Sequence, residues 1–132
     1  MKKILPAIIP ARLESKSVKR KNFKNLKGKI LIDYTLSNAL ESKLIDKVII
    51  TTDNLKYLKK LSKNQNKKII LHNRSKKIAG DKSKMISVLK DCVKKLEKLK
   101  FNFDYVILLQ PTSPFRRLKD INKSIQKIKR SN

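Results

Sequence analysis

Four short apolar runs limit the folds that this chain can adopt. They are ILPAII, KVIITT, KKIIL and DYVILL, at residues 4–9, 47–52, 67–71 and 104–109. Each run is rich in isoleucine, valine or leucine, and none alternates strictly between apolar and polar residues. Strands that are buried on both faces have this composition, and they occur in parallel sheets covered by helices on both sides. We therefore expect four strands of a parallel sheet.

Stretches with helical spacing follow each of these runs. Residues 31–42, 55–63, 85–99 and 118–130 carry apolar side chains three and four positions apart. The strongest pattern is the third, which places a row of apolar side chains along one face over four turns. The repeated order of strand and helix predicts an α/β fold with right-handed crossovers. A chain of 132 residues has the size of one domain.

Polar clusters follow the expected strands and read PARLESK, TTDN, HNRS and QPTSPFR. The carboxyl ends of parallel strands meet at one edge of a sheet, and ligands bind in the crevice outside that edge. The cations Arg12, Lys16 and Arg74 indicate an anionic ligand. The side-chain amides of Asn22 and Gln110 are suited to reading the edge of a base, because each offers a donor and an acceptor.

The first of these clusters has an unusual composition for a phosphate loop. Such loops usually contain glycines, which let backbone N–H groups approach the oxygens. PARLESK contains no glycine, and the chain has neither a Walker A motif nor GxGxxG. Phosphate binding would therefore rely on the side chains of Arg12, Ser15 and Lys16. The alternative interpretation is an ordinary exposed basic loop.

Several residues near the expected site have structural interpretations. Asp53 is expected to cap the helix that begins after it. His72 has no metal-ligand companions at a useful spacing, so we assign it a structural role. Cys92 lies on the apolar face of its helix and is expected to be a small core residue. Asp81 and Ser83 precede the strongest helical pattern and are suited to capping it.

The net charge of +25 suggests nucleic acid or an anionic membrane surface as a partner. Lysine outnumbers arginine by 29 to 6, however, and the lysines are spread along the chain. Nucleic-acid readers use arginine for bidentate contacts and aromatic side chains for stacking, and this chain has few arginines and no tryptophan. We favour a solvated lysine-rich surface. A basic α/β module that binds RNA or another polyanion is the alternative.

The expected location is the cytoplasm. No apolar run approaches the roughly 20 residues of a membrane helix, so no membrane partner is expected. The N-terminus lacks the pattern of a signal peptide. The single Cys92 agrees with a reducing compartment, because it cannot form a disulfide within the chain.

Four segments, in this order and spacing, resemble the acylneuraminate cytidylyltransferases, that is, the CMP-N-acetylneuraminate synthetases and relatives acting on other nonulosonic acids. They are IIPARLESKSVKRKNFKNLKGKILIDYTLSNAL, IDKVIITTDN, RSKKIAGD and VILLQPTSPFR. The resemblance implies a Rossmann-like nucleotidyltransferase sheet, mostly parallel with alternating helices. It also implies a transferase that joins CTP to a nonulosonic acid for cell-surface polysaccharide biosynthesis. The products are a CMP-sugar and pyrophosphate, and the cofactor is Mg²⁺.

The resemblance implies roles for individual residues. Arg12, Lys16 and Lys21 are the implied catalytic cations. The implied CTP-binding residues are Arg12, Ser15, Lys16, Asn22, Arg74, Ser83 and Gln110. The cations would neutralise the triphosphate and stabilise the pyrophosphate that leaves. No carboxylate of the chain matches a metal ligand, so the ligands of Mg²⁺ are expected outside it. Family loops often read Arg-Gly-Gly-Ser-Lys-Gly, and here Leu13, Glu14 and Ser17 replace the glycines.

We expect residues 1–132 to be a single N-terminal portion of a cytidylyltransferase domain. The family's catalytic domains are considerably longer, so the chain looks truncated. The second half of such a domain supplies the sugar pocket, the metal-binding aspartates and the contacts of a homodimer. The chain alone is therefore expected to be weakly active or inactive as an enzyme.

Overall fold

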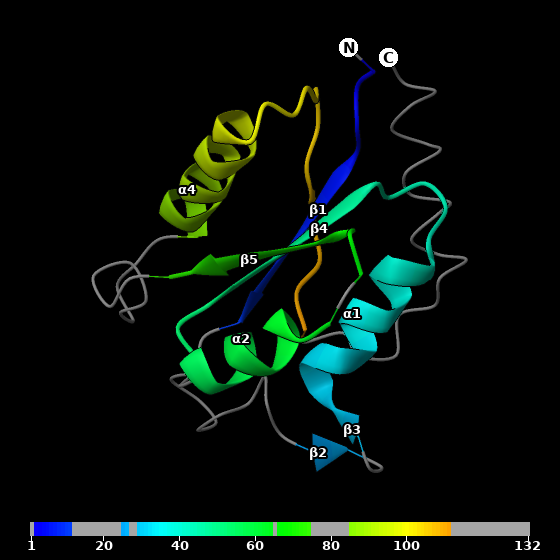
Figure 1. Cartoon of the computed structure of the whole chain (residues 1–132), viewed down its shortest axis with the longest axis vertical. Coiled ribbons are helices and arrows are strands. Elements are labelled where there is room, and N and C mark those ends of the chain that lie inside the picture. The colour runs from blue at the N-terminus through cyan, green and yellow to red at the C-terminus, as the bar shows by residue number, and fades with distance from the viewer. Residues whose placement is uncertain (1, 12–24, 27–28, 65, 75–84, 112–132) are drawn as a thin grey trace.

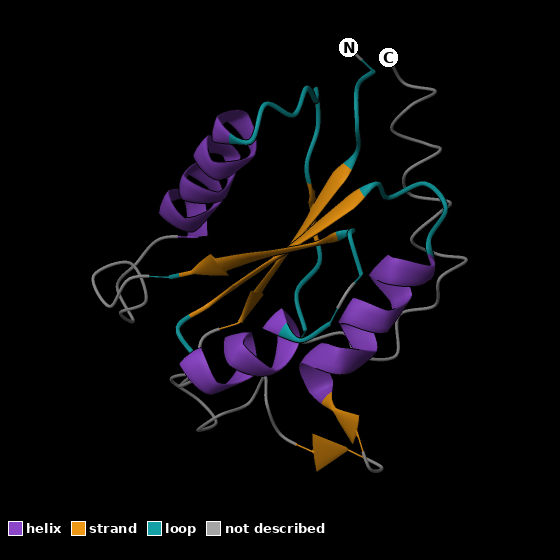
Figure 2. Ribbon diagram, in the orientation of Figure 1, coloured by secondary structure: helices purple, strands orange, loops and turns teal. Residues whose placement is uncertain are grey.

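Four parallel strands form the central sheet of this protein, and helices cover both of its faces (Figure 1, Figure 2). The computed structural model describes residues 2–11, 25–26, 29–64, 66–74 and 85–111. The strands are β1 (Pro6–Ala11), β4 (Lys47–Thr52), β5 (Ile69–Asn73) and β6 (Ile107–Leu108). Their order across the sheet is β5-β4-β1-β6, and every pair is parallel.

Three helices and a small hairpin complete the described part of the chain. The helices are α1 (Leu31–Glu41), α2 (Leu55–Ser62) and α4 (Met85–Lys98). The hairpin pairs β2 (Asn25–Leu26) with β3 (Lys29–Ile30). Within the described ranges, no helix has both the length and the apolar character that a membrane crossing requires.

The two faces of the sheet carry different helices. Ile8 and Ile49 lie under α4 and pack with Cys92 and Leu96. Their neighbours on β1 and β4 point to the opposite face, where α1 and α2 cover them (Figure 1). Both central strands are thus buried on both sides, which explains why the apolar runs in the sequence do not alternate. Burial of one such isoleucine contributes about 1.5–3 kcal/mol relative to an exposed position.

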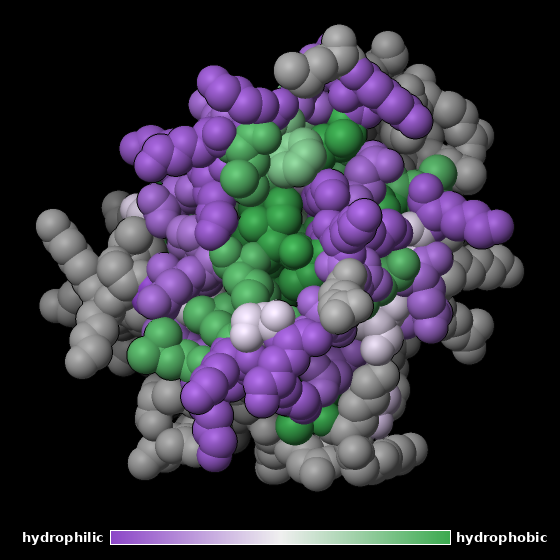
Figure 3. All heavy atoms as spheres, viewed as in Figure 1, coloured by the Kyte–Doolittle hydropathy of each residue, from purple (hydrophilic) through white to green (hydrophobic). Residues whose placement is uncertain are grey.

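On the face seen in Figure 3, apolar side chains gather in the middle and hydrophilic side chains surround them. Cys92 is 0% exposed, so the expectation of a small core residue is confirmed.

The expected parallel sheet with alternating helices is confirmed, but the strand limits differ. β1 and β5 each end two residues later than the apolar runs predicted. His72 and Asn73 therefore lie inside β5, where the sequence had suggested a loop. The hairpin of β2 and β3 was not expected. The helix expected over 118–130 lies outside the described residues.

The predicted cap of α2 was wrong by one residue. The N-cap is Asn54, whose Oδ1 accepts a hydrogen bond of 3.1 Å from the Tyr57 backbone N–H. This N–H is three residues beyond the cap, the position that a capping side chain reaches. Asp53 lies one residue too early to cap in this way. Thr52 fixes the turn, because its Oγ1 accepts a hydrogen bond of 3.1 Å from the Asn54 backbone N–H.

Two side chains hold α1 in place, one from α2 and one from the segment before β5. The Tyr57 hydroxyl of α2 donates to Asp33 Oδ1 of α1 over 2.6 Å. Burial and this carboxylate raise the pKa of Tyr57 far above its usual value. Lys68, just before β5, donates from Nζ to the carbonyl oxygens of Leu40 (3.1 Å) and Ser42 (2.9 Å). A cation at the carboxyl end of α1 also suits the helix dipole.

Lys68 provides a test of this helix end. The variant Lys68→Met keeps most of the side-chain stem and loses both hydrogen bonds. We expect the free energy of unfolding to fall by about 1–2 kcal/mol, because the donor is charged but the site is only partly buried. Urea unfolding measures the change. Lys67→Met is the matched control, since it removes the same charge from an exposed neighbour. Equal effects of the two variants would contradict the assignment.

Candidate functional site

The carboxyl ends of the four strands form one edge of the sheet, and this edge is the candidate site. From β1 the chain passes through α1, β4 and α2 to β5, moving in one direction across the sheet. After α4 it crosses back and adds β6 on the other side of β1. The strand order therefore reverses between β1 and β6. In open α/β sheets, ligands bind in the crevice outside the strand ends at this point of reversal.

Pro10 limits the pairing of β1 with β6 at this point. The Leu109 backbone N–H donates to Ile8 O over 2.9 Å, so Ile8 turns its backbone groups toward β6. Pro10 is two residues further and turns its nitrogen the same way, but it has no N–H to donate. The recorded β1–β6 register accordingly ends at Ile8 with Leu108. Among the described residues, the backbone pairing of the two strands goes no further than this pair.

Arg74 lies at the same edge, directly after β5. Its backbone N–H donates to Thr52 O over 2.9 Å and continues the pairing with β4. Its guanidinium donates from Nη2 to Thr51 O over 3.2 Å. Thr51 is in register with Pro10 of β1, so the guanidinium reaches across the end of β4. The residue is only 4% exposed, and a cation this buried is held in a defined position.

Gln110 lies at the opposite end of the same edge. It follows β6, is exposed, and stands between two buried residues, Leu109 and Pro111. β1 and β4 separate β6 from β5, so the strands that carry Gln110 and Arg74 are roughly 14 Å apart at a typical strand spacing. A ligand that contacts both residues would extend across the ends of β1 and β4.

The structure brings Arg74 and Gln110 to one edge, as the sequence predicted. Their roles in binding stay predictions. The remaining predicted site residues lie outside the described residues. These are Arg12, Ser15, Lys16, Lys21, Asn22 and Ser83.

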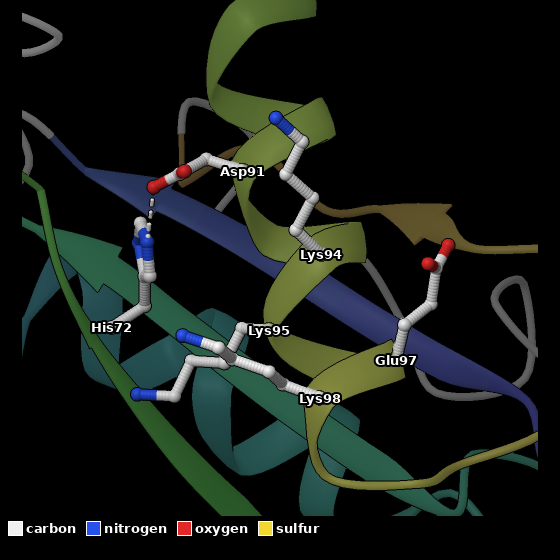
Figure 4. A pocket seen from close by; sticks show the side chains of 6 residues that line it. All are labelled: His72, Asp91, Lys94, Lys95, Glu97 and Lys98. Atoms are coloured by element: carbon white, nitrogen blue, oxygen red, sulfur yellow. Dashed lines mark hydrogen bonds and ion pairs between the residues drawn. The ribbon is translucent and has the colours of Figure 1, made fainter.

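A second polar cluster lies beside Arg74, between β4, β5 and α4 (Figure 4). His72 Nδ1 is 2.7 Å from Thr51 Oγ1, and His72 Nε2 is 2.7 Å from Asp91 Oδ2. Cys92 Sγ is 4.0 Å from His72 Nδ1. A structural role for His72 was expected, but its partners were not. Thr51 and Asp91 are far from it along the chain, and only the fold brings the three residues together.

The described residues do not provide a metal site. Within that part of the chain, no three histidine, cysteine, aspartate or glutamate side chains are grouped as a metal ion requires. The described residues therefore do not fit the Mg²⁺ that the family resemblance implies.

A family model described as Cytidylyltransferase matches residues 6–132. The chain belongs to the cytidylyltransferase family. The match includes the strand ends that form the candidate site. It confirms the resemblance inferred from the sequence motifs.

Three curated relatives of this cytidylyltransferase chain are longer than it is. The CMP-N,N'-diacetyllegionaminic acid synthase of Legionella pneumophila is 35% identical over 120 residues, which are 91% of this chain and 51% of the relative. The N-acylneuraminate cytidylyltransferase of Escherichia coli is 34% identical over 91% of this chain and 27% of its own length. The pseudaminic acid cytidylyltransferase of Campylobacter jejuni is 32% identical, with shares of 91% and 49%. The chain thus spans about half of these relatives or less.

Solved structures confirm the nucleotidyltransferase fold. CMP:2-keto-3-deoxy-manno-octonic acid synthetase, solved with CTP, matches 96% of this chain and 47% of its own, with a TM-score of 0.68 and 22% identity. A 4-diphosphocytidyl-2C-methyl-D-erythritol synthase matches 96% of this chain and 54% of its own, with a TM-score of 0.72 and 12% identity. The Rossmann-like sheet expected from the sequence is therefore the fold of this cytidylyltransferase chain.

The thiol of Cys92 tests the packing beneath this edge. Burial raises its pKa from the ordinary 9.0 to about 11. At neutral pH this lowers the thiolate fraction by about 100-fold, and the thiolate is the reactive form. We expect a disulfide reagent such as DTNB to modify the native chain at least about 100-fold more slowly than the urea-unfolded chain at the same pH. Similar rates in the two states would show that Cys92 is not enclosed.

Proposed function

We propose that this chain is the CTP-binding part of a cytidylyltransferase that joins CTP to a nonulosonic acid. The supporting observation is the family match over residues 6–132, which includes the strand ends where Arg74 and Gln110 lie. The products would be a CMP-sugar and pyrophosphate. The relatives named above are synthases and cytidylyltransferases of legionaminic, pseudaminic and N-acylneuraminic acids, so the proposed substrate is an acid of this class.

The proposed chemistry follows from charge. CTP carries a highly charged triphosphate, and a guanidinium such as that of Arg74 can pair with two phosphate oxygens at once. Arg12, Lys16 and Lys21 are proposed to act on the same group. In the reaction the sugar acid replaces pyrophosphate on the α-phosphate, so negative charge builds on the leaving group. Fixed cations stabilise that charge as it develops.

Gln110 is the proposed contact to the base. Cytosine presents an amino donor where uracil presents a carbonyl acceptor, and the side-chain oxygen of Gln110 can accept from this amino group. Its exposure at the end of β6 suits a contact with a ligand. The same proposal gives Asn22, Ser15 and Ser83 supporting contacts to the nucleotide.

We also propose several properties of the whole enzyme. The sugar-acid pocket, the ligands of Mg²⁺ and the homodimer contacts would be supplied by the sequence that the relatives have beyond this match. A cytoplasmic location is proposed because CTP is made and used there. A role in cell-surface polysaccharide biosynthesis is proposed from the class of sugar acid.

Calorimetric titration with CTP tests the proposal, with UTP and ATP as competitors for specificity. We expect the chain to bind CTP in preference to both. Arg74→Gln should weaken binding by about 10–100-fold, because a hydrogen bond to a charged group contributes roughly 1.5–3 kcal/mol. Arg74→Lys keeps the charge but not the bidentate geometry, so an intermediate loss is expected.

Lys59→Gln is the matched control for charge, since Lys59 is an exposed residue of α2. Circular dichroism shows whether each variant is folded. Absence of CTP binding by the folded wild-type chain would overturn the proposal. RNA binding that persists at physiological salt, together with that absence, would favour the polyanion-binding alternative.

A further inference from the structure

Hydrogen bonds on either side of Thr51 connect the surface of α4 to the candidate site at the carboxyl ends of the strands. The connection starts at Asp91, whose carboxylate meets His72 Nε2 at 2.7 Å. His72 Nδ1 meets Thr51 Oγ1 at 2.7 Å, and the carbonyl of Thr51 accepts from the Arg74 guanidinium at 3.2 Å. The four residues belong to α4, β5, β4 and the segment after β5. One end of the connection is half-exposed and the other is buried.

The order carboxylate, imidazole, hydroxyl is also that of a catalytic triad, but this arrangement cannot work as one. A nucleophilic hydroxyl must be open to a substrate. Thr51 is 0% exposed and lies in a central strand of the sheet. Its hydroxyl is therefore available to His72 and its other buried neighbours, and not to a ligand.

The outer side of the cluster faces an open cavity of about 710 Å³ between β5 and α4 (Figure 4). Its lining residues are His72, Asp91, Lys94, Lys95, Glu97 and Lys98. The lining carries charges of both signs and so does not concentrate one charge for a ligand. Lys95 Nζ donates to Leu71 O of β5, next to His72. Asp91 and Lys95 thus both attach α4 to β5 at adjacent strand residues.

We propose that His72 is a positioning residue for Arg74 in nucleotide binding, an inference that rests on the proposed function of this edge. The side-chain hydroxyl of Thr51 is hydrogen-bonded to His72, and its backbone carbonyl accepts from the Arg74 guanidinium. His72 and Arg74 are two positions apart, so their side chains leave the strand on the same side. Fixing Thr51 through His72 therefore fixes the carbonyl that orients the guanidinium.

The loss of His72 would matter energetically because Thr51 is buried. A buried hydroxyl that loses its partner carries a desolvation cost until the backbone or side chain moves to a new partner. Without His72, the end of β4 would relax in this way, and the Thr51 carbonyl would shift with it. The guanidinium would then lose one of the contacts that fix its direction across the strand end. Asp91 supports the arrangement from the other side by holding the imidazole ring in place.

The test uses variants of the full chain and a readout that does not depend on nucleotide. His72→Phe keeps a ring of similar size and removes both hydrogen bonds. Asp91→Asn keeps an acceptor and removes the charge. Val88→Ala is the matched control, because Val88 packs in the same core under α4 and its side chain makes no hydrogen bond. The heteronuclear NOE of the ¹⁵N-labelled Arg74 Nε–H group reports the motion of the guanidinium directly.

We expect the Arg74 Nε–H group to be rigid in the wild type and in Val88→Ala, and mobile in His72→Phe. The Kd for CTP should rise by about 10-fold in His72→Phe, a common cost of losing a supporting hydrogen bond. Asp91→Asn should show a smaller change of the same sign. Val88→Ala should lower the melting temperature while leaving the Kd unchanged.

A rigid Arg74 side chain in folded His72→Phe would overturn the proposal. If that variant does not fold, His72→Gln decides, since glutamine leaves one polar group and should give an intermediate mobility. Unchanged mobility in folded His72→Gln would then also overturn it. Failure of the wild type to bind CTP would contradict the proposed function alone, because the Arg74 signal is measured without nucleotide.

Discussion

The pairing of β1 with β4 holds the two central strands of the sheet in register and decides which side chains face each layer of helices. Six consecutive pairs join the strands, from Pro6 with Lys47 to Ala11 with Thr52. A shift by one residue would turn the side chains of one strand to the opposite face. The present register places Ile8 beside Ile49 under α4. It also ends both strands at the same level, and the candidate site begins there.

The apolar runs predicted the sheet well, because a strand buried on both faces leaves a strong signal in the sequence. The strand limits were less predictable. The first strand was expected to end before Pro10, but β1 continues to Ala11. Proline is tolerated inside β1 because its nitrogen faces β6, and the hydrogen-bonded pairing with β6 ends before Pro10. His72 was expected to lie beyond β5, because a polar residue after an apolar run usually marks the end of a buried strand. The bonds to Thr51 and Asp91 compensate its burial.

The candidate site was predictable in its position but not in its contacts. Parallel strands alone imply that Arg74 and Gln110 share one edge, and the family motifs single out the same two residues. The strand order could not be inferred, because a crossover can lead to either side of β1. The interaction of His72 with Asp91 joins β5 to α4, and no local pattern connects the two residues. Such a contact follows from the packing of α4 on the sheet.

Amide chemical shifts show directly whether a cytidine nucleotide binds at the carboxyl ends of the strands. The measurement is a titration of the ¹⁵N-labelled chain with CTP, followed by ¹H–¹⁵N correlation spectra. We expect saturable shifts that are largest at Ala11, Asp53, Arg74 and Gln110, and small at the carboxyl end of α4 near Leu99. Shifts centred on α4, or shifts equal for CTP and inorganic polyphosphate at every residue, would contradict binding of a cytidine nucleotide at this edge.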